Sequence, residues 1–377
     1  MTARTDPRIP VRMPSGFDRA AAEREDDGLL DRLRADEASR VLVLHADTAQ
    51  VTGPSGVRVV DVPEPEPGPG SVVIDVHAVG VSFPDLLLSR GLYQLRPDPP
   101  FTLGVDVAGT VVTAPTGIPG IEPGARVAGV VPYGGAGEHA VVPVSGVFPL
   151  PERLSYDEGA ALPMNYLTAL FTLQERGQVR EGETVLVHGA AGGVGSATLQ
   201  VARGLGARTI AVVSTEQKAA FARDVGADET VLLGGFKDAV TELTGGRGVD
   251  AVVDVVGGDV FTDSLRCLAE QGRLLVVGFA SGQGIPEVKV NRLLLRNVDV
   301  RGVGWGGFAM SKPTYLRRQW DVLLPMIESG VVSPPIGATY GFEQFGRALQ
   351  DLADRRTSGK SVVRVREGRI SPVGSCG

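Results

Sequence analysis

The chain has 377 residues and a formal net charge of −7, with 44 acidic against 37 basic side chains. This acidic balance argues against nucleic acid as a partner, and no apolar run approaches the ~18 residues that a membrane span needs. Two cysteines, Cys267 and Cys376, exclude a disulfide framework and favour a cytoplasmic protein, while the length favours two domains over a single core.

The first 40 residues differ from the rest of the chain, because they are rich in Arg, Asp and Glu and carry no strand pattern. We expect a charged N-terminal extension over 1–40, in which 17–40 have the spacing of a helix with Leu29, Leu30 and Leu33 on one side. This extension is either solvated or packed on the body or on a partner. Residues 367–377 are expected to form a loose tail.

Residues 41–160 are dominated by β patterns. The β-branched segments predict short strands separated by Gly and Pro, at 41–44, 57–60, 72–76, 105–112, 126–131 and 138–142. One helix is predicted at 83–90, just after Ser82. Short strands with such turns between them favour a twisted antiparallel barrel over a parallel sheet.

From 161 to 306 the pattern alternates between strand and helix. Strands are predicted at 184–188, 209–213, 230–232, 250–256, 273–277 and 299–303, with helices such as 216–225 and 261–269 between them. This order is typical of a Rossmann-type doubly wound parallel sheet. Helices at 315–328 and 343–353 and a strand at 360–365 follow, and we expect that strand to return to the first domain. That domain would then be discontinuous, with parts 41–160 and 307–366.

A glycine-rich turn joins the first strand of this second domain to a helical pattern. Its core reads Ala190-x-Gly192-x-x-Gly195, with Gly193 and Val194 completing the turn. Gly192 lets the backbone approach a pyrophosphate, Gly195 lets the helix pack on the strand, and the free N–H groups of the first helical turn face the anion. The turn thus predicts a dinucleotide site. The alternative is an ordinary glycine-rich turn.

The end of the next strand predicts which dinucleotide binds. Where an NAD-preferring unit carries a carboxylate, this chain has Ser214, and Lys218 follows one turn into the next helix. A hydroxyl and an ammonium can bind the 2′-phosphate on the NADPH ribose, whereas a carboxylate would repel it. We therefore expect NADPH over NADH. In the alternative, Lys218 is a solvated surface lysine and Glu216 binds the ribose.

Several motifs in a fixed order resemble the medium-chain dehydrogenase/reductase superfamily, in its zinc-free quinone oxidoreductase branch, the zeta-crystallin-like proteins. The resemblance covers about 40–366, and its motifs lie at 65–70, 79–85, 90–93, 158–163, 188–195, 245–250 and 254–258. It implies a GroES-like β-barrel substrate domain, a nucleotide domain and a site in the cleft between them. It also implies that Thr168 lies beside the cofactor.

Residue types at the metal positions of this superfamily predict that no zinc is bound. The metal-dependent branch places a cysteine where this chain has Ser82, and a His-Glu pair where it has Val105-Asp106. The four histidines, His45, His77, His139 and His188, are scattered, and His188 is expected in a loop. Two cysteines also exclude a four-cysteine structural lobe.

Without a Lewis acid, hydride transfer to an already electrophilic carbon is the natural chemistry, which favours a quinone or a conjugated enone. Tyr93 matches a family tyrosine and Ser82 stands where quinone reductases often carry asparagine, so both are candidate catalytic donors. Leu87, where a second tyrosine is common, makes the pocket less polar. Asp85 is either a general acid or a helix-start carboxylate, and the candidate substrate-pocket residues are Asn165 and Tyr133.

Further cofactor contacts are expected at the carboxyl ends of the later strands, at Val256, Gly257, Phe279 and Ser281. Lys360 matches a family Gly-Lys pair and either reaches the cofactor or lies in a surface turn.

Three hypotheses about function remain open: a reductase of quinones or enones, an enoyl-thioester reductase, and a non-catalytic NADPH-binding protein. The segment 299–306 is expected to be a sheet edge, which invites pairing in a homodimer.

Overall fold

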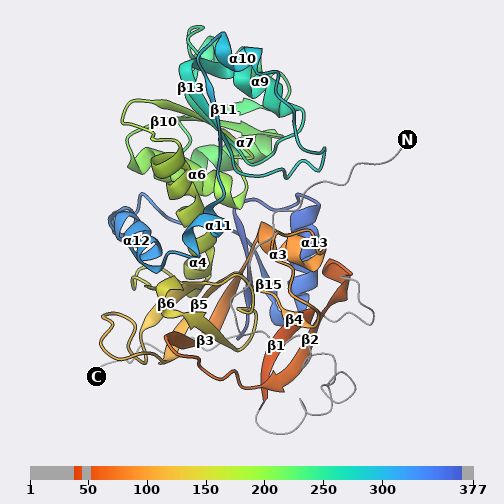
Figure 1. The fold of residues 1–377 in the computed structure, drawn as a ribbon, viewed down its shortest axis with the longest axis vertical. Coiled ribbons are helices and arrows are strands. Elements are labelled where there is room, and N and C mark those ends of the chain that lie inside the picture. Colours follow the sequence, from red (N-terminus) through yellow and green to blue (C-terminus); the bar gives the residue numbers. More distant parts are fainter. Residues whose placement is uncertain (1–37, 45–51, 367–377) are drawn as a thin grey trace.

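The computed structural model describes residues 38–44 and 52–366, and it folds into two main sheets joined by helices (Figure 1). The predicted helix at 17–40 lies outside these residues except for its last three, which form part of a strand, β1 (Ala38–Leu44). β1 belongs to a small sheet with β2 (Val57–Pro63) and β4 (Phe101–Thr102).

The nucleotide-type sheet has six parallel strands in the order β11-β10-β9-β12-β13-β14. Its strands are β9 (Thr184–His188), β10 (Arg208–Val213), β11 (Glu229–Leu232), β12 (Val249–Asp254), β13 (Leu268–Val276) and β14 (Asp299–Gly302). The connecting helices include α6 (Gly193–Gly204), α7 (Glu216–Asp224), α8 (Phe236–Leu243), α9 (Val260–Cys267) and α10 (Asn291–Leu294). The predicted doubly wound sheet is confirmed.

The direction of winding reverses at the centre of this sheet. From β9 the chain moves outward to β10 and β11, then returns to the other side of β9 with β12. Ligands of doubly wound sheets bind at this switch point, outside the carboxyl ends of the strands. Both faces of β9 are covered, because Val185 and Val187 belong to one buried cluster and Leu186 to another.

The second sheet has the order β15-β16-β3-β5-β6-β8, with β7 pairing to β3. Its strands are β3 (Ser71–Val81), β5 (Asp106–Thr113), β6 (Arg126–Val130), β7 (His139–Pro143), β8 (Val147–Pro149), β15 (Ile336–Gly341) and β16 (Lys360–Arg364). β16 lies antiparallel to β3, so the last strand does join the first half of the chain, and β15 pairs parallel to β16. β15 was absent from the sequence prediction.

Helical segments connect the two sheets. The chain passes from one to the other through α4 (Tyr156–Ala161), η3 (Pro163–Leu167), α5 (Thr168–Leu170) and η4 (Phe171–Arg176), and returns through α11 (Trp305–Ala309) and α12 (Pro313–Glu328). The remaining helical elements are α3 (Phe83–Ser89), α13 (Phe345–Ala353), η1 (Pro54–Gly56), η2 (Val144–Gly146) and η5 (Phe342–Gln344). Within the described ranges, no helix has the length and apolarity of a membrane span.

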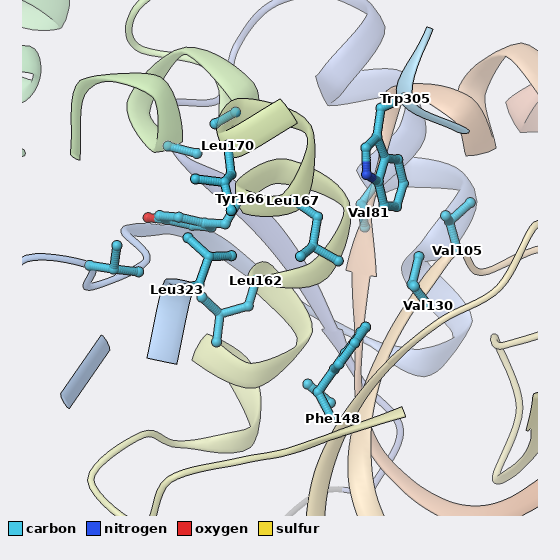
Figure 2. Close-up of a cluster of buried hydrophobic side chains, with 14 of the residues drawn as sticks. Val81, Val105, Val130, Phe148, Leu162, Tyr166, Leu167, Leu170, Trp305 and Leu323 are labelled. Atoms are coloured by element: carbon cyan, nitrogen blue, oxygen red, sulfur yellow. The ribbon is translucent and has the colours of Figure 1, made fainter. Parts of the chain in front are cut away.

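One apolar core continues from the second sheet into the connecting helices. Figure 2 shows side chains of the 162–170 segment clustered with residues of β8, α11 and α12, namely Leu162, Tyr166, Leu167, Leu170, Phe148, Trp305 and Leu323. Phe148 stacks on Trp320 of α12 with ring centroids 4.6 Å apart. Such packing holds η3 and α5 in a fixed position beside the nucleotide-type sheet.

Candidate active site

The glycine turn lies at the switch point, between β9 and α6. The predicted strand–turn–helix is confirmed, since α6 begins at Gly193 directly after the turn. A Cβ at Gly195 would lie 2.2 Å from the Gly189 carbonyl oxygen and 2.7 Å from Ala190 Cα, so the helix can meet the strand here only without a side chain. The N–H groups of Gly193, Val194 and Gly195 open the helix and are available to an anion.

The η3–α5 segment packs against this turn. Asn165 is only 6% exposed, and its Nδ2 lies 2.6 Å from where a Cβ of Gly193 would be. Thr168 is also buried and begins α5, which packs on α6. The structure therefore brings Asn165 to the start of α6 and places Thr168 on the short helix that packs on α6.

Hydrogen bonds of Lys218 and Arg355 connect the segment after β10 with the segment after β13. Ser214 is exposed, and the Lys218 ammonium donates a hydrogen bond to the Arg355 carbonyl oxygen at 3.2 Å. The Arg355 guanidinium donates in turn to the carbonyl oxygens of Ala280 and Ser281, at 2.9 and 2.8 Å. Arg355 thus links the start of α7 to the segment after β13. Its position in an Arg-rich loop offered no signal by which the sequence could single it out.

The residues predicted after β12 and β13 do come together. Asp254 accepts hydrogen bonds from the N–H groups of Val256 and Gly257, at 2.8 and 2.9 Å, and burial raises the pKa of its carboxyl. The Ser281 N–H donates to the Val256 carbonyl oxygen, and Phe279 packs on Gly257. These contacts fix the strand ends that flank the switch point.

The Tyr93 side chain lies beside α11. Its hydroxyl lies 3.6 Å from where a Cβ of Gly306 would be. Burial, and secondly the charge of Asp85, raise the pKa of the Tyr93 phenol, so it keeps its proton at neutral pH. Tyr133 is more exposed and meets Phe101 edge-on, with ring centroids 6.1 Å apart.

Asp85 is the helix-start carboxylate that one of the two interpretations predicted. Its carboxylate accepts hydrogen bonds from the N–H groups of Ser82 and Gly104, at 3.0 and 2.9 Å, and these bonds fix the beginning of α3. Complete burial raises the pKa of Asp85 to about 7, against the opposing effect of these two hydrogen bonds. This carboxyl group therefore lies within the core of the fold.

Ser82 and Lys360 differ from their predicted roles. The Lys360 ammonium lies 2.6 Å from both Ser82 Oγ and Asp106 Oδ2, and Ser82 Oγ lies 2.9 Å from Asp106 Oδ2. An ammonium only donates and a carboxylate only accepts, so the single Ser82 proton goes to Asp106. Ser82 is therefore not free to donate to a substrate. Lys360 is 3% exposed, which excludes a surface turn, and its ammonium is held by Ser82 and Asp106.

His188 is likewise no loop residue. It is the last residue of β9 and fully buried, with Nε2 2.8 Å from Ser264 Oγ and its ring edge-on to Phe236. Burial lowers the pKa of His188 to about 4. Over 38–44 and 52–366, no group of three or more His, Cys, Asp or Glu residues is arranged to hold a metal ion.

Comparison with known proteins agrees with this architecture. Residues 68–152 match the alcohol dehydrogenase GroES-like domain, and 193–328 match the zinc-binding dehydrogenase domain. The bovine quinone oxidoreductase-like protein 2 is 36% identical over 301 residues, which are 79% of this chain and 86% of that protein.

Two solved structures are similar over most of the chain. A probable oxidoreductase from Mycobacterium abscessus is 42% identical with a TM-score of 0.79, covering 88% of this chain and all of that one. The quinone oxidoreductase of Thermus thermophilus, also solved in complex with NADPH, is 35% identical with a TM-score of 0.74, covering 86% and 100% of the two chains. The chain therefore belongs to the quinone oxidoreductase branch of the medium-chain dehydrogenase/reductase family of oxidoreductases.

Proposed function

We propose that this protein is an NADPH-dependent reductase that transfers a hydride to an electrophilic carbon of a quinone or a conjugated enone. The observation that carries the proposal is the glycine turn at the switch point, with Asn165 packed over the first residue of α6. The related T. thermophilus enzyme, which binds NADPH, supports the choice of cofactor. Bound NADPH would supply the hydride, from C4 of its nicotinamide.

The residues present fit that cofactor. The open N–H groups of α6 suit a pyrophosphate, because a helix N-terminus carries partial positive charge. Lys218, on the helix that follows β10, and Arg355, whose backbone it contacts, suit the additional 2′-phosphate of NADPH. We propose Ala190, Val256, Gly257, Phe279 and Ser281 as the further contacts at the strand ends.

Tyr93 is the residue that we propose as donor to the substrate carbonyl. Hydride arrival at a conjugated carbon places negative charge on that oxygen, and a neutral hydroxyl stabilises it. The raised pKa of Tyr93 keeps the phenol protonated for this purpose. Asn165 and Tyr133 are proposed to line the substrate pocket.

An assay of NADPH oxidation with benzoquinones, enones and enoyl thioesters tests this function. Turnover with quinones or enones supports the proposal, and turnover with enoyl thioesters alone would replace it with the thioester alternative. Tight NADPH binding without turnover of any acceptor would instead indicate a binding protein. The Tyr93→Phe variant, which lacks the proposed donor, should bind NADPH normally and turn over slowly.

We also propose that the protein is a cytoplasmic homodimer that pairs through the β14 edge. The end of the parallel sheet carries this strand, and large apolar side chains nearby are more than 70% exposed, namely Ile285, Val290, Leu294 and Leu295. An apolar patch beside an unpaired strand edge is a suitable surface for a second copy.

A further inference from the structure

A buried charged cluster lies behind the site and takes no part in the proposed chemistry. Lys360, Asp106 and Ser82 contact one another at 2.6 to 2.9 Å, and each is less than 5% exposed. We call these three side chains the Lys360 clamp. A buried ion pair loses so much hydration that it seldom adds net stability over an apolar replacement. Its presence therefore points to a role other than stability.

The clamp joins the segments that surround the glycine turn. Asp106 Oδ1 accepts the N–H of Met164 at 2.8 Å, which holds the start of η3, the element that carries Asn165. The N–H of Gly359, next to Lys360, donates to the Ala191 carbonyl oxygen within the glycine turn, also at 2.8 Å. One cluster thus ties both η3 and the glycine turn to the second sheet.

The Lys360 clamp is also linked to Tyr93 through Asp85. The Ser82 N–H donates to Asp85, which lies close enough to Lys360 and Asp106 for its charge to interact with both. Asp85 also acts electrostatically on Tyr93. Asp85 and Tyr93 are therefore titratable groups that are coupled to the clamp.

Gly80 of β3 leaves room for the Lys360 side chain. A Cβ at Gly80 of β3 would lie 2.7 Å from Lys360 Cε and 2.0 Å from the Ala160 carbonyl oxygen. Gly80 therefore leaves the space through which the lysine stem reaches Asp106. A side chain on β3 at this place would close that path.

We propose that Lys360 is a positioning residue for hydride transfer. Its ammonium holds Asp106 and Ser82, and this clamp sets η3 and the start of α3 against the glycine turn, which fixes the distance between cofactor and substrate. The inference rests on the proposed reductase function. It adds that a cation remote from the reacting atoms controls the rate of the hydride step.

The test compares the Lys360→Met and Asp106→Asn variants with the double variant that carries both changes. Each single change strands a buried charge and is expected to lower stability. The double variant strands none, so it should fold, and its kcat reports on positioning alone. The control is Arg364→Met, on the same strand, which breaks only the surface pair with Asp157.

We expect the double variant to bind NADPH as the wild type does and to lose about tenfold or more in kcat, because small misplacements slow hydride transfer. With NADPH deuterated at the transferred position, its primary isotope effect should rise.

Three results would overturn the inference. A folded double variant with wild-type kcat and isotope effect would make the clamp purely structural. Weakened NADPH binding with an unchanged single-turnover rate would make Lys360 a cofactor contact. Equal losses in Arg364→Met would make the effect non-specific. If the wild type turned over no acceptor, the reductase proposal would fail and this inference with it, whereas an active wild type with an equally active double variant would overturn the inference alone.

Discussion

The Lys218 ammonium donates its hydrogen bond to the backbone of Arg355, 137 positions later in the chain, at 3.2 Å. This contact joins the start of α7, which follows β10, to the loop before β16, and the Arg355 guanidinium lies on the Ala280 and Ser281 carbonyl oxygens. A charge-assisted hydrogen bond to phosphate is worth roughly 1.5–3 kcal/mol. The pair therefore has the strength needed to discriminate between two dinucleotides.

We predict that Lys218→Ala and Arg355→Ala each lower the preference for NADPH over NADH about tenfold or more, since each removes one cation from the 2′-phosphate. Steady-state kcat/KM with both cofactors measures the change. Lys237→Ala, on α8 and paired with Asp238, is the control and should keep the wild-type ratio. If the ratio of kcat/KM with NADPH to that with NADH were unchanged in both test variants, these cations would not bind the 2′-phosphate, and Glu216 would be the residue that binds the ribose.

Replacement of Tyr93 by phenylalanine removes the proposed donor to the substrate oxygen. We expect kcat to fall about 100-fold, as for loss of a single oxyanion donor, with a smaller change in KM. Tyr340→Phe is the matched control, because the Tyr340 hydroxyl bonds Asp351 at 3.1 Å, away from α11. Equal kcat in wild type and Tyr93→Phe would assign the donor role to water or to the backbone.

His188 makes stability depend on pH with a definite sign. Its pKa is lowered to about 4 from 6.5, so between these values the unfolded chain binds a proton that the folded chain does not. Stability from this group is complete above pH 6.5 and is lost as pH falls, by about 2 kcal/mol at pH 5. Urea unfolding at pH 7 and pH 5 should show a change in stability that is about 2 kcal/mol less favourable in the wild type than in His188→Gln.

Asp85 changes the pH dependence of stability in the opposite direction to His188, so the two contributions must be separated. Because its pKa is raised to about 7, the folded chain takes up a proton there as pH falls, which adds stability over the same interval. Asp85 is present in both proteins, so only the difference between wild type and His188→Gln isolates the histidine. Equal losses in the two proteins would contradict the lowered pKa.

The homodimer prediction concerns the apolar side chains beside β14. We expect Leu294→Asp to convert a dimer into a monomer, since burying a carboxylate in an apolar interface is unfavourable. Light scattering at micromolar concentration measures the mass. Leu233→Asp is the control, because Leu233 is 41% exposed next to β11, at the opposite edge of the sheet. A wild-type protein with the mass of one chain would refute the dimer.

The nucleotide-type sheet could be predicted because its signals are local. The run Thr184–His188, the glycine turn and α6 follow one another directly, and each has its own pattern. β15 was missed because Ile336–Gly341 contains two glycines and is only partly buried. It becomes a strand through pairing with β16, a contact that no local pattern contains.

The same reasoning explains why the contact between Ser82 and Lys360 could not be predicted. A serine at the superfamily's metal position has the chemistry of a donor, and a lysine after glycine has the chemistry of a phosphate ligand. What decides their roles is a contact between them that spans 278 positions. Sequence supplies the groups, and only the folded chain shows that each is engaged by the other.

The insertion of β16 between β15 and β3 has a consequence for biosynthesis. β3 leaves the ribosome early, and its partner Lys360–Arg364 follows only after all strands of the nucleotide-type sheet have been made. β7 pairs with residues 71–75 of β3, but residues 78–81 stay unpaired on that edge until β16 emerges, while the nucleotide-type sheet can already form. Nascent chains should therefore acquire a protease-resistant nucleotide half first, and they should expose an aggregation-prone strand edge to chaperones until β16 has been made.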